Sequence, residues 1–138
     1  MFNATPVVES ALKNAGLKCQ AIDLGELSFV QAGFTGENCT VSLRFISADN
    51  DNDVKVMTED IAKVNSAKQD RMYVVLNDLN VKYKYVKFTM DDNGGVCAQY
   101  DVPISVGESL GAVALEIALR FAKIVDDAYP EIMKIIWG

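Results

Sequence analysis

The sequence predicts an α+β protein in which helices pack on an antiparallel sheet, in the order α-β-β-β-α-β-β-α. Three observations predict this: apolar residues at helical spacing in three segments, a period of two in the segments between them, and turn residues that separate the segments. The chain has 138 residues, of which 50% are hydrophobic and 23% charged, which is typical of a folded domain. No linker or repeat interrupts it, so we expect a single two-layer domain over residues 1–138.

The N-terminal part predicts one short helix followed by three strands. Thr5 followed by Pro6 is typical of a helix start, and Gly16 suits a left-handed helix end. Between residues 19 and 57 the period changes from helical to two. The apolar residues of this region fall into three groups: Leu27 and Phe29; Val41, Leu43 and Phe45; and Val54 and Val56.

The next segment predicts a helix and a hairpin. Ser66 and Gln69 have the spacing of a capping box, and Asn80 suits a left-handed end of the helix that they open. The residues from Tyr83 to Met90 then alternate as a strand does. The following DDNGG stretch contains Asn-Gly between two alternating runs, which favours a tight hairpin over a phosphate-binding loop, because phosphate loops lead into a helix.

A third, long helix completes the predicted order. Ser105 and Glu108 form another capping box, and the apolar helix that follows runs to about Asp127. Pro130 either kinks this helix or starts a final turn.

Residue types exclude several chemistries. The chain contains no histidine, which removes imidazole bases and the usual histidine-containing zinc sites. Its three cysteines are widely spaced, which is typical of reduced thiols. Asp49, Asp51 and Asp53 resemble the first ligands of a calcium loop, but Val54 stands where that loop needs glycine, so a solvated acidic turn is favoured. We therefore expect no enzyme activity, no metal and no cofactor.

Charge disfavours nucleic acid and membrane partners. The net charge is −6, and binding to polyanions depends on lysine and arginine. Lysines and tyrosines alternate over residues 82–85, as in a stacking platform for single strands, but in a strand Lys82 and Lys84 lie opposite Tyr83 and Tyr85. We interpret this stretch as a solvated sheet face. No window predicts a membrane span, and no signal peptide is recognisable, so a cytoplasmic location is expected.

The third helix is apolar around most of its circumference. Glu116, Arg120, Lys123 and Asp127 form one narrow charged stripe. So wide an apolar arc indicates either deep burial within the chain or a surface covered by a partner, and we expect a homodimer through this region. The candidate interface residues are large and apolar: Phe121, Ile124, Ile132, Ile136 and Trp137.

Two stretches carry a resemblance to a known family. The run VLNDLNVKYKYVKFTMDDNGGVCAQYDVP and the later DDAYPEIMKIIWG resemble the bacterial YbjN-like family, whose members are similar in fold to class I type III secretion chaperones. The resemblance begins at about Val54 and implies a non-enzymatic regulator with a chaperone-like protein contact. Our leading hypothesis is therefore a protein-interaction module that binds itself or another bacterial protein; the alternative is a regulatory domain that senses a small molecule.

Overall fold

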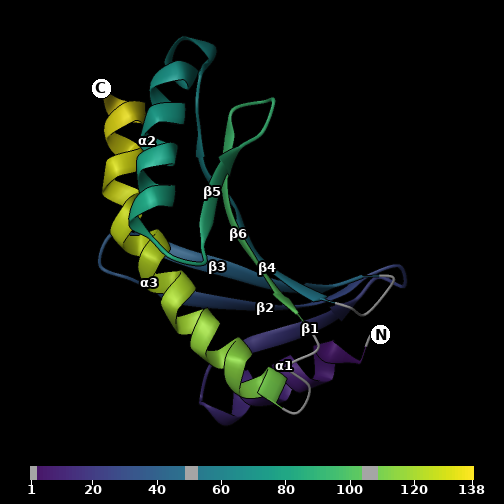
Figure 1. The fold of residues 1–138 in the computed structure, drawn as a ribbon. Coiled ribbons are helices and arrows are strands. Elements are labelled where there is room, and N and C mark those ends of the chain that lie inside the picture. The colour runs from purple at the N-terminus through teal and green to yellow at the C-terminus, as the bar shows by residue number, and fades with distance from the viewer. Residues whose placement is uncertain (1–2, 49–52, 104–108) are drawn as a thin grey trace.

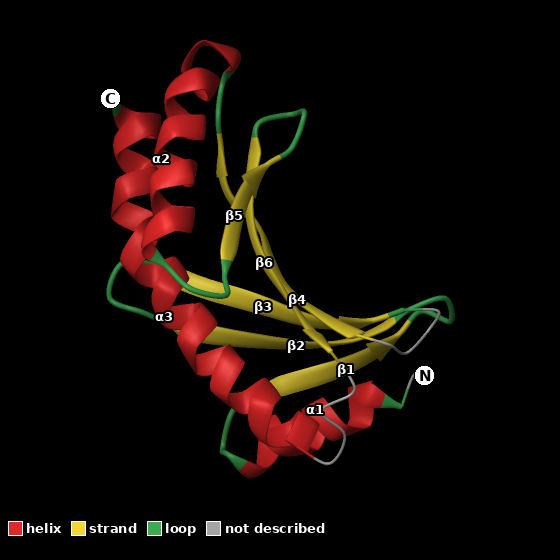
Figure 2. Ribbon diagram, viewed as in Figure 1, coloured by secondary structure: helices red, strands yellow, loops and turns green. Residues whose placement is uncertain are grey.

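The computed structural model describes residues 3–48, 53–103 and 109–138. These residues form three α-helices and one six-stranded sheet, whose arrangement is drawn in Figures 1 and 2. In chain order, the elements are α1 (Ala4–Asn14), β1 (Cys19–Asp23), β2 (Ser28–Thr35), β3 (Thr40–Ser47), β4 (Asp53–Lys63), a 3₁₀ turn (Ser66–Lys68), α2 (Gln69–Lys82), β5 (Lys87–Met90), β6 (Gly95–Pro103) and α3 (Leu110–Trp137).

The sheet is antiparallel, with the strand order β1-β2-β3-β4-β6-β5. The predicted α+β class is therefore confirmed, but the predicted element order lacks one strand, β1. This strand is a short edge strand with no fully buried residue, so it carries none of the apolar alternation that revealed the other strands.

A bulge in β4 divides the sheet into two arms. The register between β4 and β6 shifts between Thr58 and Ala62, and Asp60 lies there with φ = 55°. In Figure 1 the first arm, β1 to β3, is covered from below by α1 and on its left by α3, and the second arm, β5 and β6, lies beside α2 and the end of α3. The long helix α3 thus crosses both arms.

The core lies between the helices and the sheet face that they cover. The period of two predicted for β3 is confirmed, because Val41, Leu43 and Phe45 are buried while the residues between them are more exposed. In α2 the buried side chains are Met72, Leu76 and Leu79, as helical spacing predicts. These residues belong to one apolar cluster with members from all three helices.

Three predicted helix boundaries are wrong. Thr5 is not an N-cap but lies inside α1, buried, with its hydroxyl 2.6 Å from that of Ser28. Ser66 starts a 3₁₀ turn with no side-chain cap, so the capping box with Gln69 does not form. α2 continues past Asn80 to Lys82, because Asn80 has a different partner in β5. The left-handed conformation of Gly16 is confirmed, with φ = 82°.

The hairpin after β5 is confirmed, but its turn is longer than predicted. The N–H of Asp91 donates to the carbonyl of Gly95 (2.9 Å), and only Gly94 of the Asn-Gly pair has positive φ, 84°. This geometry is a three-residue loop that ends in a left-handed glycine.

Pro130 lies inside a continuous helix rather than at a helix start. Two further predictions, the Ser105–Glu108 capping box and the acidic turn at Asp49 and Asp51, lie outside the described residues.

Candidate functional site

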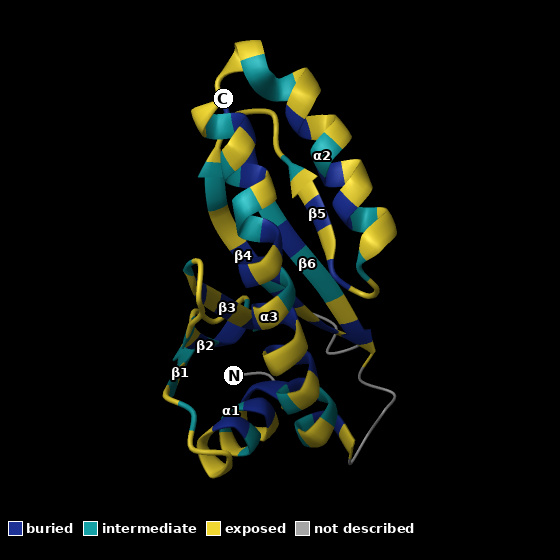
Figure 3. Cartoon of the chain, turned by 90° about the vertical axis from the view of Figure 1, so that its left-hand side faces the viewer, coloured by how far each residue is buried: buried dark blue, intermediate teal, exposed yellow. Residues whose placement is uncertain are grey.

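The five candidate interface residues of α3 fall into different environments. Phe121 and Ile132 are 0% exposed and belong to the core cluster, where a partner cannot reach them without rearrangement. Ile124 and Ile136 are half-buried against that cluster. Trp137 is 81% exposed at the end of the helix. Burial by the chain itself thus accounts for most of the apolar arc of α3, as the bands along α3 in Figure 3 illustrate.

Sequence reasoning missed a second apolar face, on α2. Tyr73, Val74 and Val81 are 53%, 62% and 80% exposed, and at 100° per residue they fall within an arc of about 100° opposite the buried side of α2. We call these three residues the α2 face. The sequence contained a signal for this face, because Tyr73, Val74 and Val81 are apolar but do not share the helical spacing of the buried residues of α2.

Trp137 lies near the first turn of α2. The ammonium of Lys68, just before α2, donates to the carbonyl of Ile136 (2.8 Å), which holds the end of α3 beside the start of α2. The α2 face and Trp137 therefore belong to the same end of the molecule, where α2 and α3 run side by side (Figure 2).

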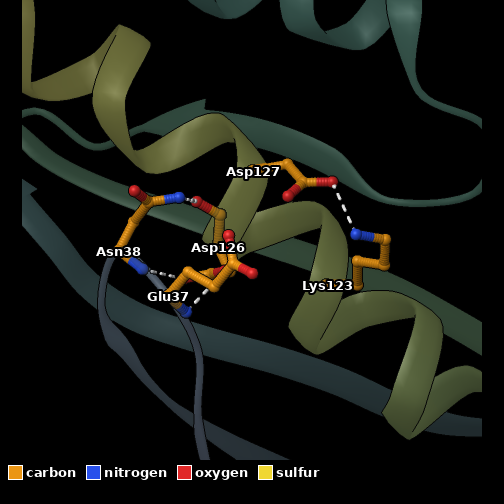
Figure 4. A network of polar contacts seen from close by, with 5 residues as sticks. All are labelled: Glu37, Asn38, Lys123, Asp126 and Asp127. Atoms are coloured by element: carbon orange, nitrogen blue, oxygen red, sulfur yellow. Dashed lines mark hydrogen bonds and ion pairs between the residues drawn. The ribbon is translucent and has the colours of Figure 1, made fainter.

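A buried carboxylate joins α3 to the β2–β3 turn. Asp126, 8% exposed, accepts three backbone hydrogen bonds. Two come from the N–H groups of Glu37 (3.0 Å) and Asn38 (2.8 Å), as Figure 4 shows, and the third comes from the N–H of Cys39 (3.0 Å). A side chain at Gly36 would collide with this carboxylate, so glycine is required at that point of the turn.

The same turn also satisfies a carbonyl that Pro130 leaves free. Proline has no N–H, so in α3 the carbonyl four residues earlier, that of Asp126, loses its helical partner. The side-chain amide of Asn38 donates to this carbonyl (3.0 Å) and replaces the missing bond. The proline is therefore tolerated in the helix because the β2–β3 turn supplies a donor.

These contacts change the pKa of two groups. The hydrogen bond from Asn38, with those from Glu37 and Cys39, holds the pKa of Asp126 below its ordinary value of 3.8, although burial opposes this. Burial, with the charge of Asp126 nearby, raises the pKa of the Cys39 thiol to about 11. A carboxylate saturated by donors is a poor general base, and a protonated thiol is a poor nucleophile. The contacts of this site anchor the β2–β3 turn to α3.

A cavity of about 420 Å³ lies between α3 and the connection from α2 to β5. It is lined by Tyr83, Lys84, Tyr85, Arg120, Lys123, Ile124 and Asp127. The predicted strand over residues 83–90 is wrong in its first half, because β5 begins at Lys87. The argument that lysines and tyrosines lie on opposite faces therefore does not apply, and both residue types reach one cavity.

No group of side chains that could hold a metal ion occurs within residues 3–48, 53–103 and 109–138. In the same ranges, no helix is both long and apolar enough to cross a membrane.

Residues 6–133 match the model of the family YbjN, described as "Putative bacterial sensory transduction regulator". The chain belongs to the YbjN family. The resemblance found in the sequence is thus confirmed, and the match also spans the N-terminal third. No curated protein matches the sequence.

Among the solved structures similar to this YbjN-family chain are one from E. coli and one from Yersinia pestis. One is the "Crystal structure of YbjN, a putative transcription regulator from E. coli", with 13% identity, a TM-score of 0.60, and coverage of 95% of this chain and 93% of that one. The other is the Yersinia pestis type III secretion chaperone SycH in complex with a fragment of YscM2, with 14% identity, a TM-score of 0.48, and coverage of 89% and 99%. The E. coli structure supports the fold.

Proposed function

We propose that this YbjN-family protein is a non-enzymatic, cytoplasmic protein-interaction module that acts as a single domain in regulation, with a chaperone-like contact to another chain. The observation that carries the proposal is the α2 face. Three large apolar side chains on one side of a helix, each more than half exposed, make an unpartnered surface of the kind that protein partners cover.

The chemistry of the described residues supports a binding role. Asp126 is committed to the β2–β3 turn, and the three cysteines are free thiols, each with its pKa raised by burial. Such groups are suited to holding a fold together and not to covalent or acid–base catalysis.

We further propose that the first partner of the α2 face is a second copy of the chain. Tyr73 and Val81 lie four residues on either side of Asn77. A two-fold axis at Asn77, with the two α2 helices antiparallel, places each Tyr73 against the Val81 of the other copy. An isologous contact of this kind buries the exposed valines and tyrosines of both copies.

Light scattering on matched variants tests the contact. We expect a mass near twice 15.1 kDa at micromolar concentration for the unaltered protein, and 15.1 kDa for the double variant Val74→Lys/Val81→Lys, because two ammonium groups cannot be buried against apolar side chains. The control is Val7→Lys/Leu24→Lys, which adds the same charge at apolar residues that are 44% and 63% exposed on α1 and the β1–β2 turn.

A monomeric unaltered protein would refute the homodimer, and a dimer that survives the α2 variant would refute its location. A different protein partner is tested by affinity capture from a bacterial lysate, with the unaltered protein, the α2 variant and the control variant each used as bait. Loss of a partner only with the α2 variant supports the interaction module.

A second candidate function is a small-molecule-sensing regulatory domain. The cavity between α3 and the α2–β5 connection favours it, because 420 Å³ falls in the usual size range of small-molecule sites. A thermal-shift screen tests it, since a ligand at about 100 times its dissociation constant adds about 2.7 kcal/mol to the free energy of unfolding.

A further inference from the structure

The α2–β5 connection contains a strained turn. The N–H of Val86 donates to the carbonyl of Lys84 (2.8 Å), and Tyr85 between them has φ = 69°. This is a γ-turn of the rare kind with positive φ, which a bulky aromatic residue adopts only when its surroundings impose it. Strained conformations of this kind concentrate at binding sites, and Tyr85 lines the cavity between α3 and the α2–β5 connection.

Contacts on both sides hold the turn in place. Val86 is buried, and the ring of Tyr85 packs edge-on against that of Tyr100, with 5.6 Å between the ring centroids. Tyr85 nevertheless remains 48% exposed. The contact with Tyr100 thus orients the ring of Tyr85, and about half of the residue remains accessible for a stacking contact.

One part of the cavity wall is apolar and aromatic, and the rest is charged. Tyr83 and Tyr85 come from the connection, and Ile124 comes from α3. The ammonium of Lys82 already lies over the ring of Tyr83, 5.2 Å from its centroid, so a ligand ring is expected to use Tyr85.

Cations outnumber carboxylates around this cavity, although the chain as a whole has a net charge of −6. Its lining includes Lys84, Arg120 and Lys123 against Asp127 alone. Arg120 and Lys123 each form an exposed ion pair within α3, with Glu116 (2.7 Å) and Asp127 (3.3 Å), and such pairs contribute little, so either cation can turn to another anion. The ammonium of Lys84 has no ion pair with any described residue.

We propose that this cavity binds a small molecule that combines a planar aromatic ring with one phosphate or carboxylate group. The ring stacks on Tyr85, and the anionic group contacts Lys84 together with Arg120 or Lys123. This proposal rests on the second candidate function and specifies its ligand. It is independent of the α2 face.

Titration followed by amide NMR spectra tests the site directly. The probes are phenyl phosphate, benzoate and adenosine monophosphate, compared with inorganic phosphate and adenosine, which each lack one half of the proposed chemistry. We expect the aromatic anions to shift the amide signals of Lys84, Tyr85 and Lys123. Inorganic phosphate and adenosine are expected to bind more weakly by a factor of about ten or more. Comparing phenyl phosphate with benzoate shows which anionic group the site prefers.

Two variants separate the ring from the charge. Tyr85→Gly keeps a residue that adopts positive φ readily but removes the ring, and Lys84→Ala removes an exposed cation. Each is expected to weaken phenyl phosphate binding about tenfold or more. Lys55→Ala, which removes an exposed lysine from the sheet, is the charge-matched control and should bind as the unaltered protein does.

Three results would overturn the proposal: no shift with any probe at millimolar concentration, equal binding of aromatic and inorganic anions, or unchanged binding by Lys84→Ala and Tyr85→Gly. The Val74→Lys/Val81→Lys variant is expected to retain the ligand. An unaltered protein that is monomeric but binds the aromatic anions would refute only the contact through the α2 face. One that dimerises but binds none of the probes would refute only the ligand proposal.

Discussion

At the scale of single residues, Asp126 connects segments far apart in the sequence. Its carboxylate and its carbonyl together accept four hydrogen bonds from Glu37, Asn38 and Cys39. Three of these donors are backbone N–H groups, which stabilise the charged form of the carboxylate. The β2–β3 turn is thereby anchored to the middle of α3.

The lowered pKa of Asp126 predicts how stability depends on pH. A carboxyl group whose pKa is lower in the folded state contributes stability above its unfolded value, near 3.8, and this contribution is lost as pH falls through the lower folded pKa. We expect Asp126→Asn to lower the melting temperature by several degrees at neutral pH, and the difference from the unaltered protein to shrink below pH 3.8.

Asp127→Asn is the control for this measurement, because Asp127 is exposed and, among the residues that the structure describes, pairs only with Lys123 at the surface. Its melting temperature should match that of the unaltered protein at every pH. Thermal melts from pH 2 to 7 compare the three proteins; a constant difference for Asp126→Asn across this range would contradict the assignment.

At the scale of elements, a helix side chain contacts each edge strand of the sheet. On β1 the N–H of Ala21 donates to the carboxylate of Glu9 in α1 (3.2 Å). On β5 the amide of Asn80 in α2 accepts from the N–H of Phe88 (2.6 Å) and donates to its carbonyl (3.0 Å), as a neighbouring strand would. Pairing of another chain at these edges would have to displace these bonds, which favours helix faces as the contact surfaces.

Removing the amide of Asn80 is expected to free the edge of β5. Asn80→Ala leaves the N–H and carbonyl of Phe88 without their partner and should lower the free energy of unfolding by about 1–2 kcal/mol. Hydrogen exchange at the Phe88 amide should accelerate as well. Asp78→Ala, an exposed position on the same helix, is the control; unchanged exchange at Phe88 in the Asn80 variant would show that water replaces the amide without cost.

At the scale of the whole molecule, α3 crosses both arms of the sheet and ends beside α2. The buried residues of α3 run from Leu110 to Ile135, and the exposed Trp137 follows them. The helix thus belongs to the core along most of its length and to the surface only at its last turn.

This arrangement predicts a separation of stability from assembly at Trp137. Because the side chain is 81% exposed, Trp137→Ala should change the free energy of unfolding by less than about 0.5 kcal/mol, while weakening the self-association that we propose. Urea denaturation and sedimentation equilibrium measure the two effects. A loss of stability with unchanged assembly would instead place Trp137 in the core.

Much of the fold could be predicted from local patterns. The strands with buried alternating residues, such as β3, and the core side of α2 were identified, because burial of one face imposes a period of two or of 3.6 on the chain. The short edge strand β1 was missed, and the alternation at residues 83–86 was extended into a strand, because alternation alone does not reveal whether a neighbouring strand is present.

The candidate sites were harder to predict. Phe121 and Trp137 are both large apolar residues of one helix, yet one is fully buried and the other is exposed. They are 16 residues apart, which at 100° per residue places them about 160° apart around the helix. Selection by residue type and size alone did not use this difference, and the burial of each also depends on which segments cover its turn of α3. The cavity at Tyr85 was missed because its lining comes from two segments about 40 residues apart.

The sequence by itself determined the fold class, the family and the absence of histidine chemistry, because these follow from residue types, local periodicity and a characteristic run of residues. Only the tertiary structure decided that Asp126 anchors the β2–β3 turn, that α2 carries a second apolar face, and that tyrosines and lysines share one cavity. The physical reason is that burial, hydrogen bonding and local charge depend on neighbours brought together by packing, and the spacing of residues along the chain does not reveal these neighbours.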